Sequence, residues 1–461
     1  MQREIEEAEQ AEENDFVRQA GYPDLAGEFE NTYGARTEPA IWGPGVSKIA
    51  DYTFQNDNPY LAQPAEPSSS SSSTQAVVIN RPMPIDTDGA LALAKRLIDE
   101  GKDLEAIQVL EVEVQRQPDS AEAWCLMGQT WAYQDQDERA IQCLVKGHDA
   151  DPYNLDSLSS LAVCCTNDGL HLEALRYLHK WIESHEEFGV LLRTRADSGA
   201  SVLDQNDFSD YEKLRDEVTS LLQTAADEVL ARGPTDPVTQ AAQAKEEASL
   251  FVVLGVVLNV NRAFGAAVKA LRAGVERSPM DASLWNKLGA TLANSGNPEA
   301  ALTCYYQALA LKPNCARSWS NLAVAHANLG NHEDAARFYL SSLVLNPKAD
   351  HLWSFVHTTM INLASDIGDP TNQSLTDVFN DPTGRAGLFG PNAGSDDLLS
   401  QETLATRYLK AAYMRDMDEC RKLIPDILES ADALPPRSTE LDRPLGEILA
   451  ELPTGDGIAK A

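Results

Sequence analysis

The sequence predicts an all-α protein in which pairs of antiparallel helices repeat along most of the chain. Prolines recur at a fixed interval, since Pro118 and Pro152, and then Pro279, Pro313 and Pro347, are 34 residues apart. The segments between these prolines carry apolar residues at helical rather than strand spacing. The composition, 43% hydrophobic and 23% charged, is that of a chain that folds over most of its length.

The 34-residue period is the length of the tetratricopeptide repeat (TPR). With each closing proline at repeat position 32, the copies start at residues 87, 121, 155, 248, 282 and 316. In the copy that starts at Ala282, the signature positions hold Trp285, Leu288, Gly289, Leu292, Ala301, Tyr305, Ala308 and Pro313. Large residues at positions 4, 7, 11 and 24 form the seam of a helix pair, and small residues at 8 and 20 let the backbones approach. Each pair leaves an apolar face uncovered, so the repeats are expected to stack into a superhelix.

In chain order, residues 1–86 are expected to be mostly disordered, because acidic residues, Ser, Gly and Pro dominate them. A first triplet of TPRs is expected over 87–188, and a degenerate repeat or hinge with one helix from about Tyr211 to Arg232 over 189–247. A second triplet is expected over 248–349. Residues 350–461 are expected to hold a seventh-repeat remnant, a loop, and helices at about 399–417, 418–432 and 438–451.

Charge and motifs exclude several classes of function. The chain has 37 basic and 71 acidic residues, a formal charge of −34, which argues against nucleic-acid binding and favours basic partners. No apolar run is long enough for a transmembrane segment, and the N-terminus does not resemble a signal peptide. The seven cysteines are odd in number and match no zinc pattern, as expected in a reducing cytosolic compartment. We find no motif for catalysis, a metal or another cofactor, so an enzyme is not expected.

The concave face of a TPR superhelix is lined by repeat positions 2, 5, 6, 9, 12 and 13. In this chain those positions hold a set of carboxamides and two cations: Asn167, Asn259, Asn286, Asn294, Asn321, Asn328, Lys287 and Arg317. Asn286 and Asn321 lie in the middle of predicted helices, where Asn is a poor helix former, so a binding role is favoured. Asn167, Asn294 and Asn328 each precede a Gly by two residues and are equally consistent with helix C-caps.

A row of carboxamides is suited to an extended peptide. Each amide both donates and accepts hydrogen bonds, so it can satisfy backbone N–H and C=O groups and donate to a terminal carboxylate. It does so without burying many protein charges, which would be costly. Lys287 and Arg317 would add positive charge for that carboxylate.

The stretch Leu284–Asn294 closely resembles the peroxisomal import receptors for C-terminal type 1 targeting signals, the peroxin-5 family. The stretches Leu161–Asn167 and Tyr52–Tyr60 are similar to that family too. The resemblance implies a cytosolic receptor that binds matrix proteins ending in Ser-Lys-Leu and cycles to the docking peroxins of the peroxisomal membrane. It implies that the asparagines bind the peptide, with Lys287 and Arg317 near its carboxylate and with these residues also lining the site: Val163, Thr166 and Asn259.

The chain also departs from the family pattern. The family carries Trp-x-x-x-Phe/Tyr docking motifs, but Trp42 is followed four residues later by Val46. Three residues, Leu25, Glu28 and Phe29, resemble the family's Leu-Val-x-Glu-Phe docking variant. The family's N-terminal recycling Cys has no counterpart before Cys125.

Two alternatives therefore stay open. One is a receptor-like TPR regulator or scaffold that binds C-terminal peptides without import. The other is a TPR co-chaperone, although its Lys at repeat position 5 is absent, since that position reads Leu91, Cys125, Ser159, Val252, Asn286 and Ser320.

Overall fold

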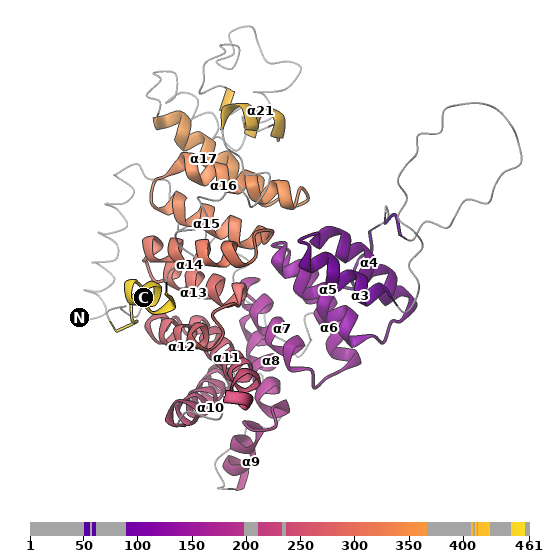
Figure 1. Cartoon of the computed structure of the whole chain (residues 1–461), viewed down its shortest axis with the longest axis vertical. Coiled ribbons are helices and arrows are strands. Elements are labelled where there is room, and N and C mark those ends of the chain that lie inside the picture. Colours follow the sequence, from indigo (N-terminus) through magenta and orange to yellow (C-terminus); the bar gives the residue numbers. More distant parts are fainter. Residues whose placement is uncertain are drawn as a thin grey trace, which may run out of the picture.

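The structure is a computed structural model. It describes residues 50–55, 58–60, 89–197, 211–232, 237–366, 407–408, 411–412, 414–424 and 444–456. The regular elements of these residues are all helices, and most of them follow one another as stacked antiparallel pairs (Figure 1). The predicted all-α TPR architecture is confirmed. The candidate docking residues Leu25, Glu28 and Phe29 lie outside the described residues.

Four of the six helix pairs begin at the predicted repeat starts, Ala121, Leu155, Ala282 and Ala316. The first triplet comprises α3 (Ala90–Asp99), α4 (Asp103–Arg116), α5 (Ala121–Tyr133), α6 (Asp137–Ala150), α7 (Leu155–Asn167) and α8 (His171–Ser184). The second comprises α11 (Pro237–Val260), α12 (Phe264–Arg277), α13 (Ala282–Asn294), α14 (Pro298–Leu311), α15 (Ala316–Asn328) and α16 (His332–Leu345). Five second helices end two residues before a closing proline, at Arg116, Ala150, Arg277, Leu311 and Leu345. This is expected, because a proline disfavours the helical conformation of the residue before it.

Glycines at repeat position 8 set the distance between the two helices of a pair. A Cβ on Gly128 would lie 2.5 Å from the Leu144 side chain, and one on Gly289 would lie 2.7 Å from the Tyr305 ring. Leu144 and Tyr305 both occupy position 24 and are buried. The seam predicted from the repeat pattern is therefore present, and these positions exclude any larger side chain.

Repeat position 15 has a left-handed backbone in every copy. Four of these residues are glycines, and the other two are Asp135 with φ 60° and Arg262 with φ 55°. A non-glycine residue in this region is strained, by roughly 1–3 kcal/mol. Asp135, in the turn between α5 and α6, thus departs from the repeat pattern. Contacts with the surrounding structure must hold its backbone in this conformation.

The region between the triplets is helical. It contains α9 (Gly189–Asp197) and α10 (Tyr211–Ala231), the second of which agrees with the predicted helix. Helix α11 begins at Pro237, before the predicted repeat start at 248, and a proline is tolerated there because the first helical N–H has no intrahelical partner. Buried residues of α7 to α12 form one continuous apolar cluster, so this region joins the two triplets.

The C-terminal part packs on the second triplet. After α17 (Leu352–Asp366), α21 (Met417–Leu423) contributes Cys420 and Leu423 to the core of that triplet. Helix α23 (Leu445–Glu451) returns to the side of α12 (Figure 1). None of the helices in the described part of the chain combines the length and apolar character needed to cross a membrane.

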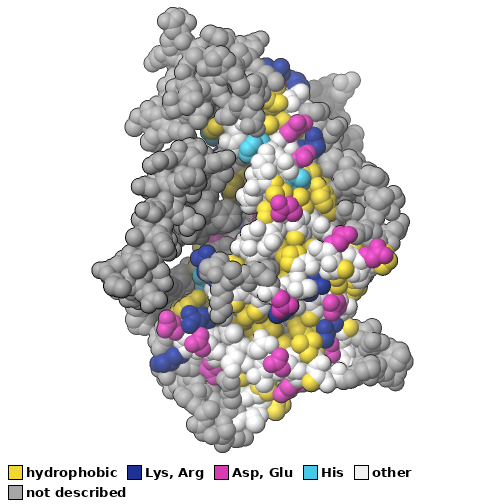
Figure 2. Space-filling model, turned by 90° about the vertical axis from the view of Figure 1, so that its left-hand side faces the viewer, with side chains coloured by type: hydrophobic (Ala, Val, Ile, Leu, Met, Phe, Trp, Pro, Cys, Tyr) yellow, Lys and Arg dark blue, Asp and Glu magenta, His cyan; other side chains and the backbone are white. Residues whose placement is uncertain are grey.

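The surface of the described residues carries charges of both signs (Figure 2). The face in Figure 2 carries acidic and basic side chains interspersed with hydrophobic ones, rather than one patch of a single sign. All seven cysteines are unpaired and buried. Burial raises the pKa of the Cys125 thiol to about 12.

Candidate peptide-binding site

Two of the predicted residues form a pair across neighbouring repeats. Asn286 lies on α13 and Asn321 on α15, and the Nδ2 of Asn321 donates to the Oδ1 of Asn286 at 3.1 Å. Both side chains are half-buried. A carboxamide has two donor hydrogens and two acceptor lone pairs, so this one bond leaves most of the capacity of the pair for a ligand.

Asn259 extends the row of amides onto α11. Its Nδ2 donates to the Gly255 carbonyl at 3.0 Å and to Thr291 Oγ1 on α13 at 2.9 Å. Its Oδ1 is buried and has no hydrogen-bond partner among the described residues. A buried acceptor without a partner costs roughly 1–3 kcal/mol, and a peptide N–H would remove that cost.

Asn167, Asn294 and Asn328 each form the last residue of a helix and are exposed. The left-handed residue that ends each helix is the glycine two positions later, with φ between 74° and 79°. The asparagines are therefore not the left-handed caps of these helices. Within the described part of the chain, the side chains of Asn294 and Asn328 make no hydrogen bond, while Asn167 Nδ2 donates to Asp137 Oδ1 at 3.4 Å.

The two further residues implied on α7 lie beside Asn167. Thr166 Oγ1 donates to the Ala162 carbonyl of its own helix at 2.8 Å, and Val163 is half-buried against the central apolar cluster. Lys287 lies on α13, where its Nζ donates to Ser283 Oγ. Burial lowers the pKa of Lys287, although the nearby Asp281 acts in the opposite direction.

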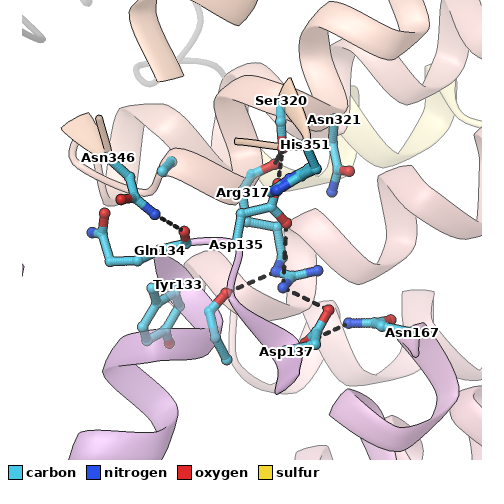
Figure 3. Close-up of polar contacts among 12 residues, drawn as sticks. Tyr133, Gln134, Asp135, Asp137, Asn167, Arg317, Ser320, Asn321, Asn346 and His351 are labelled. Atoms are coloured by element: carbon cyan, nitrogen blue, oxygen red, sulfur yellow. Dashed lines mark hydrogen bonds and ion pairs between the residues drawn. The ribbon is translucent and has the colours of Figure 1, made fainter. Parts of the chain in front are cut away.

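Arg317 connects the two triplets (Figure 3). Its Nε donates to the Ala132 carbonyl at 2.7 Å, and its Nη2 lies 2.8 Å from Asp137 and 3.3 Å from Asp135. Asp135 also accepts from Ser320 Oγ at 2.9 Å, and its Oδ2 lies 3.1 Å from His351 Nε2. We call these five residues the triplet clasp: Asp135, Asp137, Arg317, Ser320 and His351.

More bonds join the same two regions. Asn314 Nδ2 donates to the Gly101 carbonyl at 3.1 Å, and Asn346 Nδ2 donates to the Gln134 carbonyl at 2.7 Å. The turns that join the two helices of a pair, α3 to α4 and α5 to α6, therefore meet the second triplet directly. Asn167 and Arg317 both contact Asp137, and Figure 3 shows Asn321 on the same side of the clasp as Asn167. The clasp thus brings predicted residues of both triplets close together.

The two clasp carboxylates have different electrostatics. Burial would raise the pKa of Asp135, but the Arg317 charge and hydrogen bonds from His351 and Ser320 outweigh it and hold this pKa at about 2. Burial raises the pKa of Asp137, and the neighbouring Asp135 adds to the rise. Arg317 lowers the pKa of both carboxyl groups, but only at Asp135, which also accepts from His351 and Ser320, does this outweigh burial, so Asp135 is the more firmly ionised of the two.

This difference predicts a dependence of stability on pH. A group whose folded pKa is depressed contributes stability above its unfolded pKa, which is lost as pH falls through the folded value. We therefore expect the chain to lose the Asp135 contribution as pH falls from about 3.8 to about 2. Thermal unfolding between pH 2 and 7 should show a shallower decline for Asp135→Asn than for the natural chain. The Asp137→Asn variant is the matched control, and an equal change in both slopes would contradict the assignment.

Arg317 was predicted from the sequence as a site residue, but its partners in the clasp were not. Asp135 carries a detectable signal, because it replaces the glycine found at position 15 in four of the six repeats. Ser320 lies at repeat position 5, which lines the concave face, whereas nothing in the local sequence of Asp137 and His351 sets them apart.

Comparison with known proteins agrees with these repeats. A tetratricopeptide repeat model matches residues 258–313 and 291–350. The crystal structure of YrrB, "a TPR protein with an unusual peptide-binding site", is 15% identical with a TM-score of 0.24, and the match covers 53% of this chain and 95% of that one. The chain has a TPR fold, which rests on its helices and on the repeat match.

The similarity to curated proteins points to a narrower class of protein than the repeat does. The peroxisomal targeting signal 1 receptor of Dictyostelium discoideum is 34% identical over 45% of this chain and 30% of its own length. Peroxisome biogenesis protein 5 of Arabidopsis thaliana is 32% identical over 48% and 23%, and the human PEX5-related protein is 30% identical over 46% and 32%. The predicted resemblance to the peroxisomal targeting signal 1 receptors is confirmed. The chain matches less than a third of the length of each of these relatives.

Proposed function

We propose that the chain is a receptor that binds the C-termini of peroxisomal matrix proteins ending in Ser-Lys-Leu. The observation that carries the proposal is the Asn286–Asn321 amide pair on consecutive first helices. Asn259, with its unpartnered buried oxygen, lies one repeat before this pair. The names of the curated relatives support the same class of ligand.

The contacts suggest how a peptide would be held. The amides of α11, α13 and α15 would bond to its backbone, with Asn294 and Asn328 at the ends of their helices. Val163 and Thr166 would line the site from α7, and Lys287 would supply positive charge for the terminal carboxylate. Arg317 would lie near the same carboxylate while held in place by Asp135 and Asp137. Its fixed position would therefore matter to peptide binding as much as its charge.

Fluorescence anisotropy with a labelled peptide ending in Ser-Lys-Leu tests the proposal. We expect the free acid to bind much more tightly than the C-terminal amide, because each hydrogen bond to a charged group contributes roughly 1.5–3 kcal/mol. Asn286→Ala and Asn321→Ala should each weaken binding of the acid by about tenfold or more. Asn297→Ala is the control, since this amide bonds only within its own turn, to Ser295. Equal weak binding of acid and amide would refute the proposal.

The cellular part of the proposal is delivery. We propose that the receptor works in the cytosol and reaches docking peroxins at the peroxisomal membrane, with Leu25, Glu28 and Phe29 as the docking residues. A receptor-like regulator or scaffold is the second candidate, since one relative is named PEX5-related protein and not receptor. Restored peroxisomal import of a fluorescent protein ending in Ser-Lys-Leu, in cells that lack their own receptor, would separate the two.

A further inference from the structure

A short segment near the end of the chain lies against the outer helices of the second triplet. Helix α23 and the turn after it contact α12, which is the second helix of its repeat (Figure 1). Ile448, Leu449 and Leu452 are buried and belong to the core cluster of that triplet. The hydrogen bonds and the ion pair described between this segment and the second triplet all come from α12.

One face of α12 makes the polar contacts. Gly265, Lys269 and Arg272 are spaced by four and three residues, so they lie on the same side of the helix. Arg272 Nη1 donates to the carbonyls of Leu449 at 2.7 Å, Leu452 at 3.0 Å and Pro453 at 3.3 Å. The last carbonyls of a helix have no intrahelical partner, and a cation there also complements the helix dipole. Arg272 therefore caps α23 from another helix.

The turn after α23 fits the same face closely. Gly455 has φ 89°, and a Cβ on it would lie 2.2 Å from the Gly265 carbonyl oxygen. Only glycine meets both the conformation and the space. The next residue, Asp456, forms an ion pair with Lys269. Both charges are largely exposed, so this pair orients the tail more than it stabilises it.

We propose that the Gly265–Lys269–Arg272 face is a docking site for a short amphipathic helix followed by a Gly-Asp turn, and that α23 is the occupant which the chain itself provides. Every group that makes these contacts lies within residues 448–456: the three apolar side chains, the three carbonyls that accept from Arg272, the glycine and the acidic residue. A separate peptide of this sequence carries all of them. The tethered segment competes at an effective concentration in the millimolar range, and a partner helix of the same chemistry would displace it.

The test uses the full chain and a labelled peptide of residues 443–457, acetylated and amidated at its ends. The substitutions Leu449→Asp and Gly455→Ala in the chain remove its own occupant. We expect the peptide to bind this vacated chain. Its affinity for the natural chain should be lower by about tenfold or more, because the tethered segment competes. Equal affinity for both chains, or no binding to the vacated chain, would overturn the proposal.

Matched changes test the face itself. In the vacated chain, Arg272→Ala should weaken peptide binding by about tenfold or more. A peptide with Gly455→Ala should not bind, whereas one with Gly446→Ala should, because a Cβ on Gly446 meets nothing within 4 Å. A charge swap tests the Lys269–Asp456 contact without removing Arg272. The Lys269→Glu chain should bind a peptide with Asp456→Lys better than either change alone allows. Unchanged binding by the Arg272 variant would sink the assignment. The amidated peptide lacks a terminal carboxylate, so its failure would leave the Ser-Lys-Leu experiment untouched.

Discussion

Arg317→Ala is expected to destabilise the chain by about 3–5 kcal/mol, because the change leaves two largely buried carboxylates without their cation. The side chains of Arg317, Asp135 and Asp137 are only 16%, 14% and 16% exposed. The Ala132 carbonyl would also lose the Arg317 donor and keep the longer bond from the Asp135 N–H, at 3.3 Å. Urea denaturation measures the loss directly, and its slope shows whether the triplets separate before they unfold.

Arg337→Ala is the control for this substitution. Arg337 also pairs with two carboxylates, Asp334 and Glu333, but these lie on its own helix and are exposed. Its removal should cost under about 1 kcal/mol. A similar, small loss for both arginines would show that the clasp does not hold the triplets together. Arg317→Lys should recover only part of the stability, because an ammonium cannot reproduce the geometry of the guanidinium group.

Gly289→Val is expected to destabilise the second triplet by about 3 kcal/mol, at the upper end of the cost of overpacking a core. Even its first added carbon would lie 2.7 Å from the Tyr305 ring and 3.1 Å from the Cys304 Cβ. The helices α13 and α14 would have to separate, and both carry residues of the shared core. Thermal and urea unfolding would measure the cost.

A double-mutant cycle identifies the cause of that loss. Tyr305→Leu shortens the side chain that occupies the space, so Gly289→Val should cost less in this background than in the natural chain. Additive effects of the two changes would mean that backbone preference, and not the contact with Tyr305, sets the requirement for glycine.

The repeats were predictable because their determinants are local and recur. Helices α13 and α15 begin at Ala282 and Ala316, the positions that the 34-residue period gives. The amide pair was predictable for the same reason, since Asn286 and Asn321 occupy fixed repeat positions on first helices. Their contact needs only the stacking of neighbouring repeats.

The clasp and the C-terminal contact depend on distant residues. Arg317 and Asp137 are 180 residues apart, and Arg272 and Leu449 are 177 apart. Neither pair has a spacing that a helix or a repeat would enforce. The sequence placed Arg317 near a ligand carboxylate, whereas the structure shows the two protein carboxylates that hold it. Helix α11 extends beyond its repeat because nothing between Pro237 and Val260 breaks a helix.

The buried thiols can report the order in which parts of the helical array open. Four sit in the first triplet, two in the second, and Cys420 in α21. A thiol reacts as the thiolate, and burial suppresses both that form and the access of a reagent. Alkylation therefore requires the helices around a cysteine to separate. The order in which the seven cysteines are alkylated would show which part of the molecule unfolds first.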